Sequence, residues 1–123
     1  MPSVTIPGKP VPKARPRPNR RGGVWTPSKA AQTAVAYHFN RYRGRYGKQR
    51  IMAYAVFYVH VRNPVHLPDG DNLWKLVADA MEEAGVVDND RQITKSIQEV
   101  IEVGTPEEQR TVVWFGTKEE AEF

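Results

Sequence analysis

The chain has 123 residues, with 18 Lys and Arg, 14 Asp and Glu, no cysteine and a formal net charge of +4 at pH 7. This length fits one domain with a modest hydrophobic core, and the lack of cysteine excludes disulfides, zinc–thiolate sites and a cysteine nucleophile. No apolar run is long enough to span a bilayer, and the proline-rich start does not resemble a signal peptide, so we expect a cytoplasmic protein with no membrane contact.

Charge is segregated along the chain. Residues 1–50 contain twelve Lys or Arg and no Asp or Glu, whereas residues 51–123 contain six basic and fourteen acidic residues. The two halves therefore carry charges of +12 and −8. Solvated surfaces usually mix both signs, so this pattern indicates a polyanionic partner such as a nucleic acid. A basic surface that serves only solubility is the alternative.

The first 25 residues predict a basic, proline-rich arm. Residues 3–6 favour a short strand, and the prolines at 10, 12, 16 and 18 favour an extended chain over a helix. Alternate side chains of an extended chain point the same way. We therefore expect one group of cations to bind the polyanion, with Trp25 as the best candidate for base stacking. The group comprises Lys13, Arg15 and Arg17, with Arg20 and Arg21 in a flexible loop.

Residues 26–45 are predicted to form a helix that Thr26 caps, with Pro27 at its first position. The clearest strand follows at residues 51–62, where apolar residues alternate. Its second face carries Tyr54 and Tyr58, and we expect a helix or a second subunit to cover that face.

A second helix is predicted at residues 71–84, with apolar residues at helical spacing and Gly85 just beyond its end. Residues 93–103 and 110–116 predict two strands joined as a hairpin, and the tail at 118–123 is expected to fray. The order predicts one α+β domain over residues 1–123, with a mixed four-stranded sheet and two main helices.

An acidic cluster is predicted where the second helix begins. Asp69 and Asp71 flank Gly70, and two aspartates at this spacing are able to converge on one hard divalent cation. Lys75 lies one helical turn further on, where an ammonium would stabilise the charge of a phosphate during cleavage. Asp90 follows the second helix, where the chain is able to return to the neighbourhood of Asp69 and Asp71. Three aspartates and a lysine of this kind are typical of a phosphodiesterase site.

Simpler interpretations remain open for each of these residues. Asp71 is an acceptable helix N-cap, and Asp69 is an acceptable turn residue. Asp71 and Lys75 have the spacing of an ordinary helical ion pair. The stretch 88–90 is also typical of a solvated turn.

The sequence resembles the RusA family of Holliday-junction resolvases over nearly its whole length. The resemblance rests on two motifs, an Asp-x-Asp-Asn-x-x-Lys helix and an Asn-Asp-x-Gln turn, and on the proline-rich opening. They comprise residues 69–75, Asp79, residues 85–87 and 89–93, residues 8–17 and residues 25–27.

The resemblance implies a homodimeric, RusA-like endonuclease of bacterial, phage or prophage origin. Such an enzyme cuts four-way DNA junctions with paired nicks in recombination and repair. It would use Mg²⁺, with Mn²⁺ as a substitute, and no small-molecule cofactor. The resemblance assigns metal binding to Asp69, Asp71 and Asp90 and a catalytic role to Lys75. Supporting positions would be Asp79, whose role in the family is less certain, Asp88 and Asn72.

One departure from the family pattern concerns position 89, where many members have aspartate and this chain has Asn89. Asp88 is the candidate to compensate. Two rival functions stay open, a catalytically silent module that binds junction or duplex DNA and a metal nuclease for other branched DNA. Divalent-dependent nicking separates the first rival from a resolvase, and a substrate panel separates the second.

Overall fold

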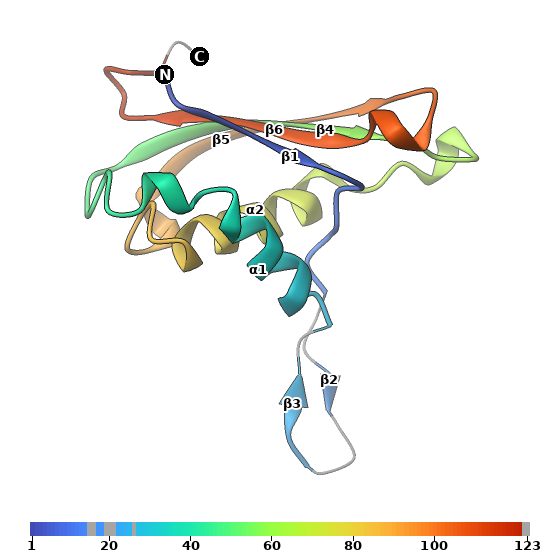
Figure 1. Ribbon diagram of the computed structural model, residues 1–123, viewed down its shortest axis with the longest axis horizontal. Coiled ribbons are helices and arrows are strands. Elements are labelled where there is room, and N and C mark those ends of the chain that lie inside the picture. The colour runs from blue at the N-terminus through green and yellow to red at the C-terminus, as the bar shows by residue number, and fades with distance from the viewer. Residues whose placement is uncertain (15–16, 19–21, 26, 122–123) are drawn as a thin grey trace.

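In the computed structural model, two helices cover one face of a four-stranded sheet (Figure 1). The structure describes residues 1–121 except 15–16, 19–21 and 26. The four strands are β1 (Ser3–Pro7), β4 (Ile51–Val59), β5 (Ile93–Glu102) and β6 (Arg110–Gly116), in the spatial order β1-β6-β4-β5. The sheet is mixed, because β4 runs parallel to β5 and antiparallel to β6. The predicted α+β class is confirmed.

The predicted hairpin between the last two strands is wrong, because β4 lies between β5 and β6. The central position suits β4, whose residues facing the helices, such as Ile51 and Phe57, are at most 1% exposed. A strand buried to this extent gains from a ladder on both of its edges. The β5–β6 connection therefore passes the end of β4, where Val103 N donates to Val59 O at 2.8 Å.

Helix α1 (Lys29–Tyr37) is shorter than the predicted helix 26–45. It begins after Ser28, and the predicted cap Thr26 lies outside the described residues. After α1 the chain continues through the 3-10 turn η1 (Asn40–Tyr42). Phe39 is fully buried against Phe115, with ring centroids 5.8 Å apart. Core packing at Phe39 thus coincides with the point where the regular helix has ended.

Helix α2 (Gly70–Glu83) matches the predicted helix 71–84 to within one residue. Its apolar stripe is buried against the sheet, and Gly85 ends it with a φ of +78°, which favours glycine. The helix connects the parallel strands β4 and β5, so both ends of α2 lie next to the ends of these strands (Figure 1). Its buried residues are Leu73, Leu76, Val77, Ala78, Ala80 and Met81.

The face of the sheet opposite the helices has no second layer among the described elements (Figure 1). Tyr54 and Trp114 are neighbours on this face, with ring centroids 5.8 Å apart, and both are half-buried. The guanidinium of Arg110 lies 3.9 Å from the centroid of the Tyr58 ring. The predicted amphipathic face of β4 is therefore not covered by any helix that the structure describes.

Two shorter features complete the chain. The strands β2 (Arg17–Pro18) and β3 (Val24–Trp25) pair as a small antiparallel ladder that extends away from the main sheet (Figure 1). Further 3-10 turns are η2 (Pro64–His66), η3 (Asp90–Gln92) and η4 (Pro106–Glu108). No helix in the described part of the chain is long and apolar enough to cross a membrane.

Candidate active site

The start of α2 is organised by Asp69 rather than by Asp71. Asp69 has extended backbone angles and is the N-cap, and its Oδ1 accepts a hydrogen bond from the backbone N of Asp71 at 2.9 Å. The interpretation of Asp71 as the cap is therefore wrong. Asp71 lies in the first turn of α2, and both carboxylates are exposed. A carboxylate has two oxygens, so the cap leaves the second oxygen of Asp69 for another partner.

A second turn of the same kind precedes η3. The side chain of Asn89 accepts from Arg91 N at 2.8 Å, and Gln92 Oε1 accepts from Asn89 N at 2.8 Å, which together make a capping box. The amide nitrogen of Gln92 donates to Gly47 O and Gln49 O, both at 2.8 Å. Gln92 thus fixes the turn that carries Asp90, a role that the sequence analysis did not assign.

Asp90 is tied to α2 as well as to its own turn. Its backbone N donates to Glu82 Oε1 at 2.9 Å, so the end of α2 holds the beginning of η3. Asp88 is exposed, and its backbone N donates to Gly47 O at 3.2 Å. Asp88 does not line the cavity that Asp90 faces.

An open cavity of about 380 Å³ brings four of the predicted residues together, Lys13 among them. Lys75 and Asp79 come from one face of α2, and Asp90 comes from η3. Asp69, Asp71 and Asn72 lie in the preceding turn at the start of α2 and are not among the residues lining this cavity. The lining consists of Lys13, Trp74, Lys75, Ala78, Asp79, Asp90 and Ile93.

Lys13 reaches this cavity from the N-terminal segment. Its ammonium donates to Asp79 Oδ2 at 2.6 Å and to Gln32 Oε1 at 3.1 Å, and its backbone N donates to Asn72 O at 3.1 Å. Asp79 is thus paired with Lys13. The described ion pairs include none between Lys75 and Asp71. Of the other predicted arm cations, Arg15, Arg20, Arg21 and the side chain of Arg17 lie outside the described residues.

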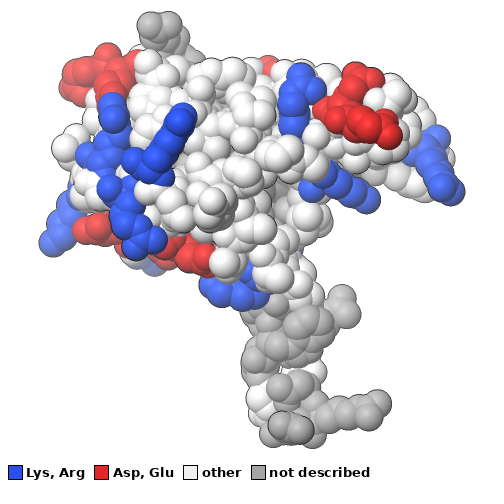
Figure 2. Space-filling model, viewed as in Figure 1, with Lys and Arg blue, Asp and Glu red and all other residues white. Residues whose placement is uncertain are grey.

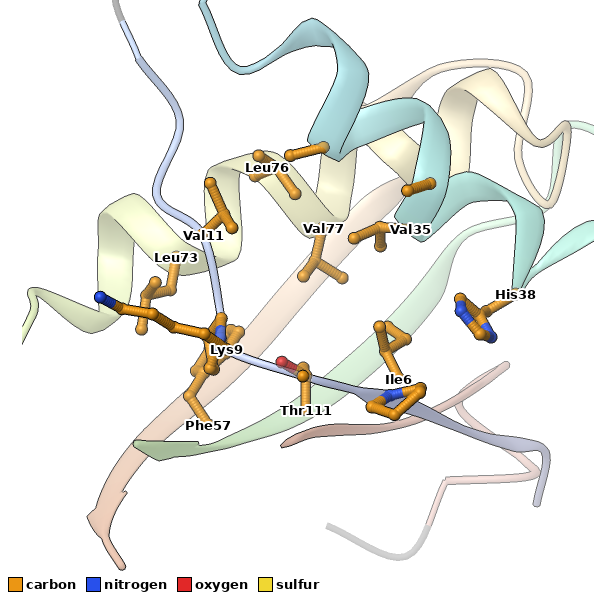
Figure 3. Close-up of a pocket in the computed structure, with 15 residues that line it drawn as sticks. Ile6, Lys9, Val11, Val35, His38, Phe57, Leu73, Leu76, Val77 and Thr111 are labelled. Carbon is orange, nitrogen blue, oxygen red and sulfur yellow. The ribbon is translucent and has the colours of Figure 1, made fainter. Parts of the chain in front are cut away.

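A second, smaller cavity of about 170 Å³ has a different character (Figure 3). It lies between β1 with the segment that follows it, α1 and α2, and Figure 3 shows Ile6, Val35 and Leu76 directed into it. Aspartate and glutamate are absent from its lining, so it offers no ligands for a hard cation. The larger cavity is therefore the candidate site for phosphodiester chemistry.

The donor set of the candidate site suits a hard divalent cation, although its carboxylates are not gathered at one point. Within the described part of the chain, no three His, Asp or Glu side chains are placed to hold a metal ion together. The carboxylates of Asp69 and Asp71 are exposed, and Asp90 faces the cavity. Mg²⁺ commonly binds through one or two carboxylates and keeps several waters. The assignment of all three aspartates as ligands stays a prediction.

Comparison with known proteins gives a family but little structural likeness. A search of curated proteins finds no match. A solved structure described as the crystal structure of a HypE–HypF complex is 19% identical, with a TM-score of 0.36. The match covers 93% of this chain and 30% of that one, and at this TM-score it carries no argument. The family model for endodeoxyribonuclease RusA, in contrast, matches residues 7–113, and the chain belongs to this family of DNA endonucleases.

Proposed function

We propose that this endodeoxyribonuclease resolves four-way DNA junctions by paired symmetric nicks and that the reaction depends on Mg²⁺. Membership of the RusA family supports a junction-resolving nuclease. The observation that carries the proposal is the convergence of Lys75 and Asp90 on one open cavity, one helical turn from Asp71.

In this proposal Asp69, Asp71 and Asp90 hold the ion, and Mn²⁺ is able to replace Mg²⁺. A bound ion of this kind polarises the phosphate and lowers the pKa of a bound water. Lys75 is exposed at the cavity, where its ammonium would lie against a phosphate oxygen and stabilise the charge that develops there. Asp79 keeps Lys13 at the same cavity, so a second cation is available to a DNA phosphate.

The test is incubation with a synthetic four-way junction, with and without Mg²⁺, beside a linear duplex of the same sequence and a flap substrate. We expect paired nicks in the junction only when Mg²⁺ is present. The control is Asp71→Asn, which should bind the junction as well as the wild type because the amide removes repulsion with phosphate, but should not nick it. Binding without nicking by the wild type would favour the silent module. Equal cutting of flaps would favour a nuclease for other branched DNA.

We also propose that the enzyme acts as a homodimer. A four-way junction is close to two-fold symmetric, and a symmetric dimer offers one site for each cut. The face of the sheet that bears Tyr54 and Trp114 supports this proposal, because none of the described helices covers it (Figure 1).

Sedimentation and plasmid cleavage test the dimer. We expect Ile101→Arg to weaken dimerisation, because Ile101 is 39% exposed and is the register partner of Tyr58 on this face. The matched control is Val65→Arg in η2, where the side chain is 84% exposed. The wild type should convert a cruciform plasmid directly to the linear form. A monomeric wild type that yields nicked circles would contradict the proposal.

A further inference from the structure

A second group of cations lies outside the arm, on the connection between α1 and β4. Residues 41–50 contain five Arg or Lys and no acidic residue, and all five are exposed. Figure 2 shows Lys and Arg side chains gathered on this end of the molecule. We call this segment the basic loop, and its cations are Arg41, Arg43, Arg45, Lys48 and Arg50.

Most of these charges have no carboxylate partner. Arg45 pairs with Glu120 at 3.5 Å, and the other four cations make no ion pair with any described residue. Four cations without an ion pair in ten residues make this segment itself positive, although Asp and Glu side chains lie beside it at the same end of the molecule (Figure 2). Such a surface attracts a polyanion rather than a single acidic side chain.

Two of the guanidinium groups make cation–π contacts with tyrosine rings. Arg41 lies 4.9 Å from the centroid of the Tyr42 ring, and its Nη2 donates to the Tyr42 hydroxyl at 3.0 Å. Arg45 lies within 6 Å of the rings of both Tyr42 and Tyr46. Tyr42 packs edge-on against the buried Phe115, with centroids 5.1 Å apart. A guanidinium placed in this way loses less conformational entropy when it binds a phosphate.

The backbone of the basic loop is bonded directly to the segment that carries Asp90. Gly44 N donates to Gly85 O at 2.7 Å, and Asp88 N donates to Gly47 O at 3.2 Å. Gln92 adds its two bonds to the carbonyls of Gly47 and Gln49. Gly44 and Gly47 have φ values of +76° and +54°, which other residues rarely adopt. The loop is therefore held at a fixed distance from Asp90.

We propose that the basic loop is a phosphate-binding surface for the DNA substrate, separate from the arm. The basic loop would bind the phosphate backbone of one DNA duplex of the junction, on one side of the cleavage point. This inference rests on the proposed function, because it takes DNA as the ligand. DNA bound at the loop would then lie beside the segment that carries Asp90, to which the loop is bonded through Gly47 and Gln49.

The test compares two variants that lose the same charge. The first is Arg41→Gln/Arg43→Gln/Lys48→Gln in the loop, and the second is Lys29→Gln/Lys95→Gln/Lys118→Gln, which removes exposed lysines elsewhere. Affinity for a four-way junction is measured by fluorescence anisotropy between 50 mM and 300 mM salt, without a divalent cation. Each lost phosphate contact reduces the steepness of the plot of log affinity against log salt concentration by about 0.9. We therefore expect the plot to be flatter by about 2.7 for the loop variant and little changed for the second variant.

The outcome separates this inference from the proposed function. Equal slopes for the two variants would overturn the inference, because net charge alone would then explain binding. A flatter slope for the loop variant would support it even if the wild type failed to nick the junction, and that failure would count against the proposed function only. All six positions are exposed, and a thermal unfolding measurement on each variant is the check that it is folded.

Discussion

The turn before α2 and the turn before η3 are both capped by a side-chain oxygen, but the capping residues differ. Asp69 accepts from the backbone N of Asp71, and Asn89 accepts from the backbone N of Arg91. Each caps a helical turn and places an aspartate at its beginning, Asp71 in one and Asp90 in the other. An amide oxygen caps a helix as well as a carboxylate does. Capping is thus a sufficient structural reason for Asn89, and it accounts for a carboxylate at position 69 equally well, so only activity separates a cap from a metal ligand there.

This comparison assigns a structural role to Asn89. Its side chain is part of a capping box with Gln92, so an amide at this position costs the site nothing in geometry. Asp88 does not line the cavity, and its compensation for the missing carboxylate stays a prediction. The two turns differ instead in support, because the second is also bonded to the basic loop and to Glu82.

The largest expected difference in nicking rate is between variants in which each cap residue is changed to the type found at the other cap. Asp69→Asn keeps the cap but removes a charge, and we expect it to abolish nicking because a neutral amide binds Mg²⁺ poorly. Asn89→Asp keeps the cap and should nick at close to the wild-type rate. The measurement is the nicking rate of both variants on a four-way junction at saturating Mg²⁺, and unfolding temperatures check that both variants are folded. An active Asp69→Asn enzyme would reduce Asp69 to a capping residue.

Lys75 tests whether the two turns serve one cavity. It lies one helical turn after Asp71 and lines the cavity with Asp90. We expect Lys75→Ala to lower the single-turnover rate by about 10²–10³, as is typical for the loss of one such donor. Lys95→Ala, on an exposed part of β5, is the control. An unchanged rate at saturating Mg²⁺ would leave Lys75 without a catalytic role.

A substitution at Gln92 tests whether the additional hydrogen bonds stabilise the turn before η3. Gln92→Ala removes three hydrogen bonds, to Asn89, Gly47 and Gln49. At roughly 0.5–1.5 kcal/mol for each bond, we expect a loss of about 2 kcal/mol in the free energy of unfolding. Asp69→Ala, which removes a single cap bond, should cost about 1 kcal/mol. Urea denaturation measures both, and equal losses would show that the extra bonds add no stability.

The smallest expected effect concerns the far end of α2. Lys29 donates to Glu83 at 2.7 Å, and this bond, more than those from Thr33 and Gln32, lowers the pKa of the Glu83 carboxyl. Lys29→Ala should raise that pKa, which an NMR titration detects. Because the folded pKa is lowered, the pair stabilises the fold above the ordinary glutamate pKa, and this contribution is lost as the pH falls through the folded value. An unchanged pKa would contradict the assignment of Lys29 as its main cause.

Much of the fold follows from local patterns. The alternation in β4 and the helical spacing in α2 predicted both elements, and Gly85 marked the end of α2 correctly. The hairpin was wrong because two adjacent strands compete for the same central neighbour, and burial of β4 decided the outcome. The predicted length of α1 was wrong, because the regular helix ends at Tyr37 and the chain continues through η1, with Phe39 buried between the two.

Part of the lining of the candidate site was predictable from the sequence, whereas its contacts were not, and Asp69 and Asp71 do not line the cavity. The convergence of Lys75, Asp79 and Asp90 agrees with the spacing along α2 and with the return of the chain after it. The pairing of Lys13 with Asp79 spans 66 positions in the sequence and leaves no local signal. The capping box at 89–92 did have one, since asparagine followed three residues later by glutamine is a recognisable helix start.

The first and last strands of the sheet pair with each other. Ser3 lies opposite Trp114, and Phe115 N donates to Pro2 O at 3.1 Å. Since β1 is an edge strand whose sheet neighbour is β6, it stays unpaired on a nascent chain until residues 110–116 have left the ribosome. The unit β4–α2–β5 contains shorter-range contacts and is able to form earlier. We therefore expect Asp69, Asp71 and Asp90 to lie in the unit that is able to form first, with the partners of Lys13 on α2, whereas β1 pairs only after β6 is present.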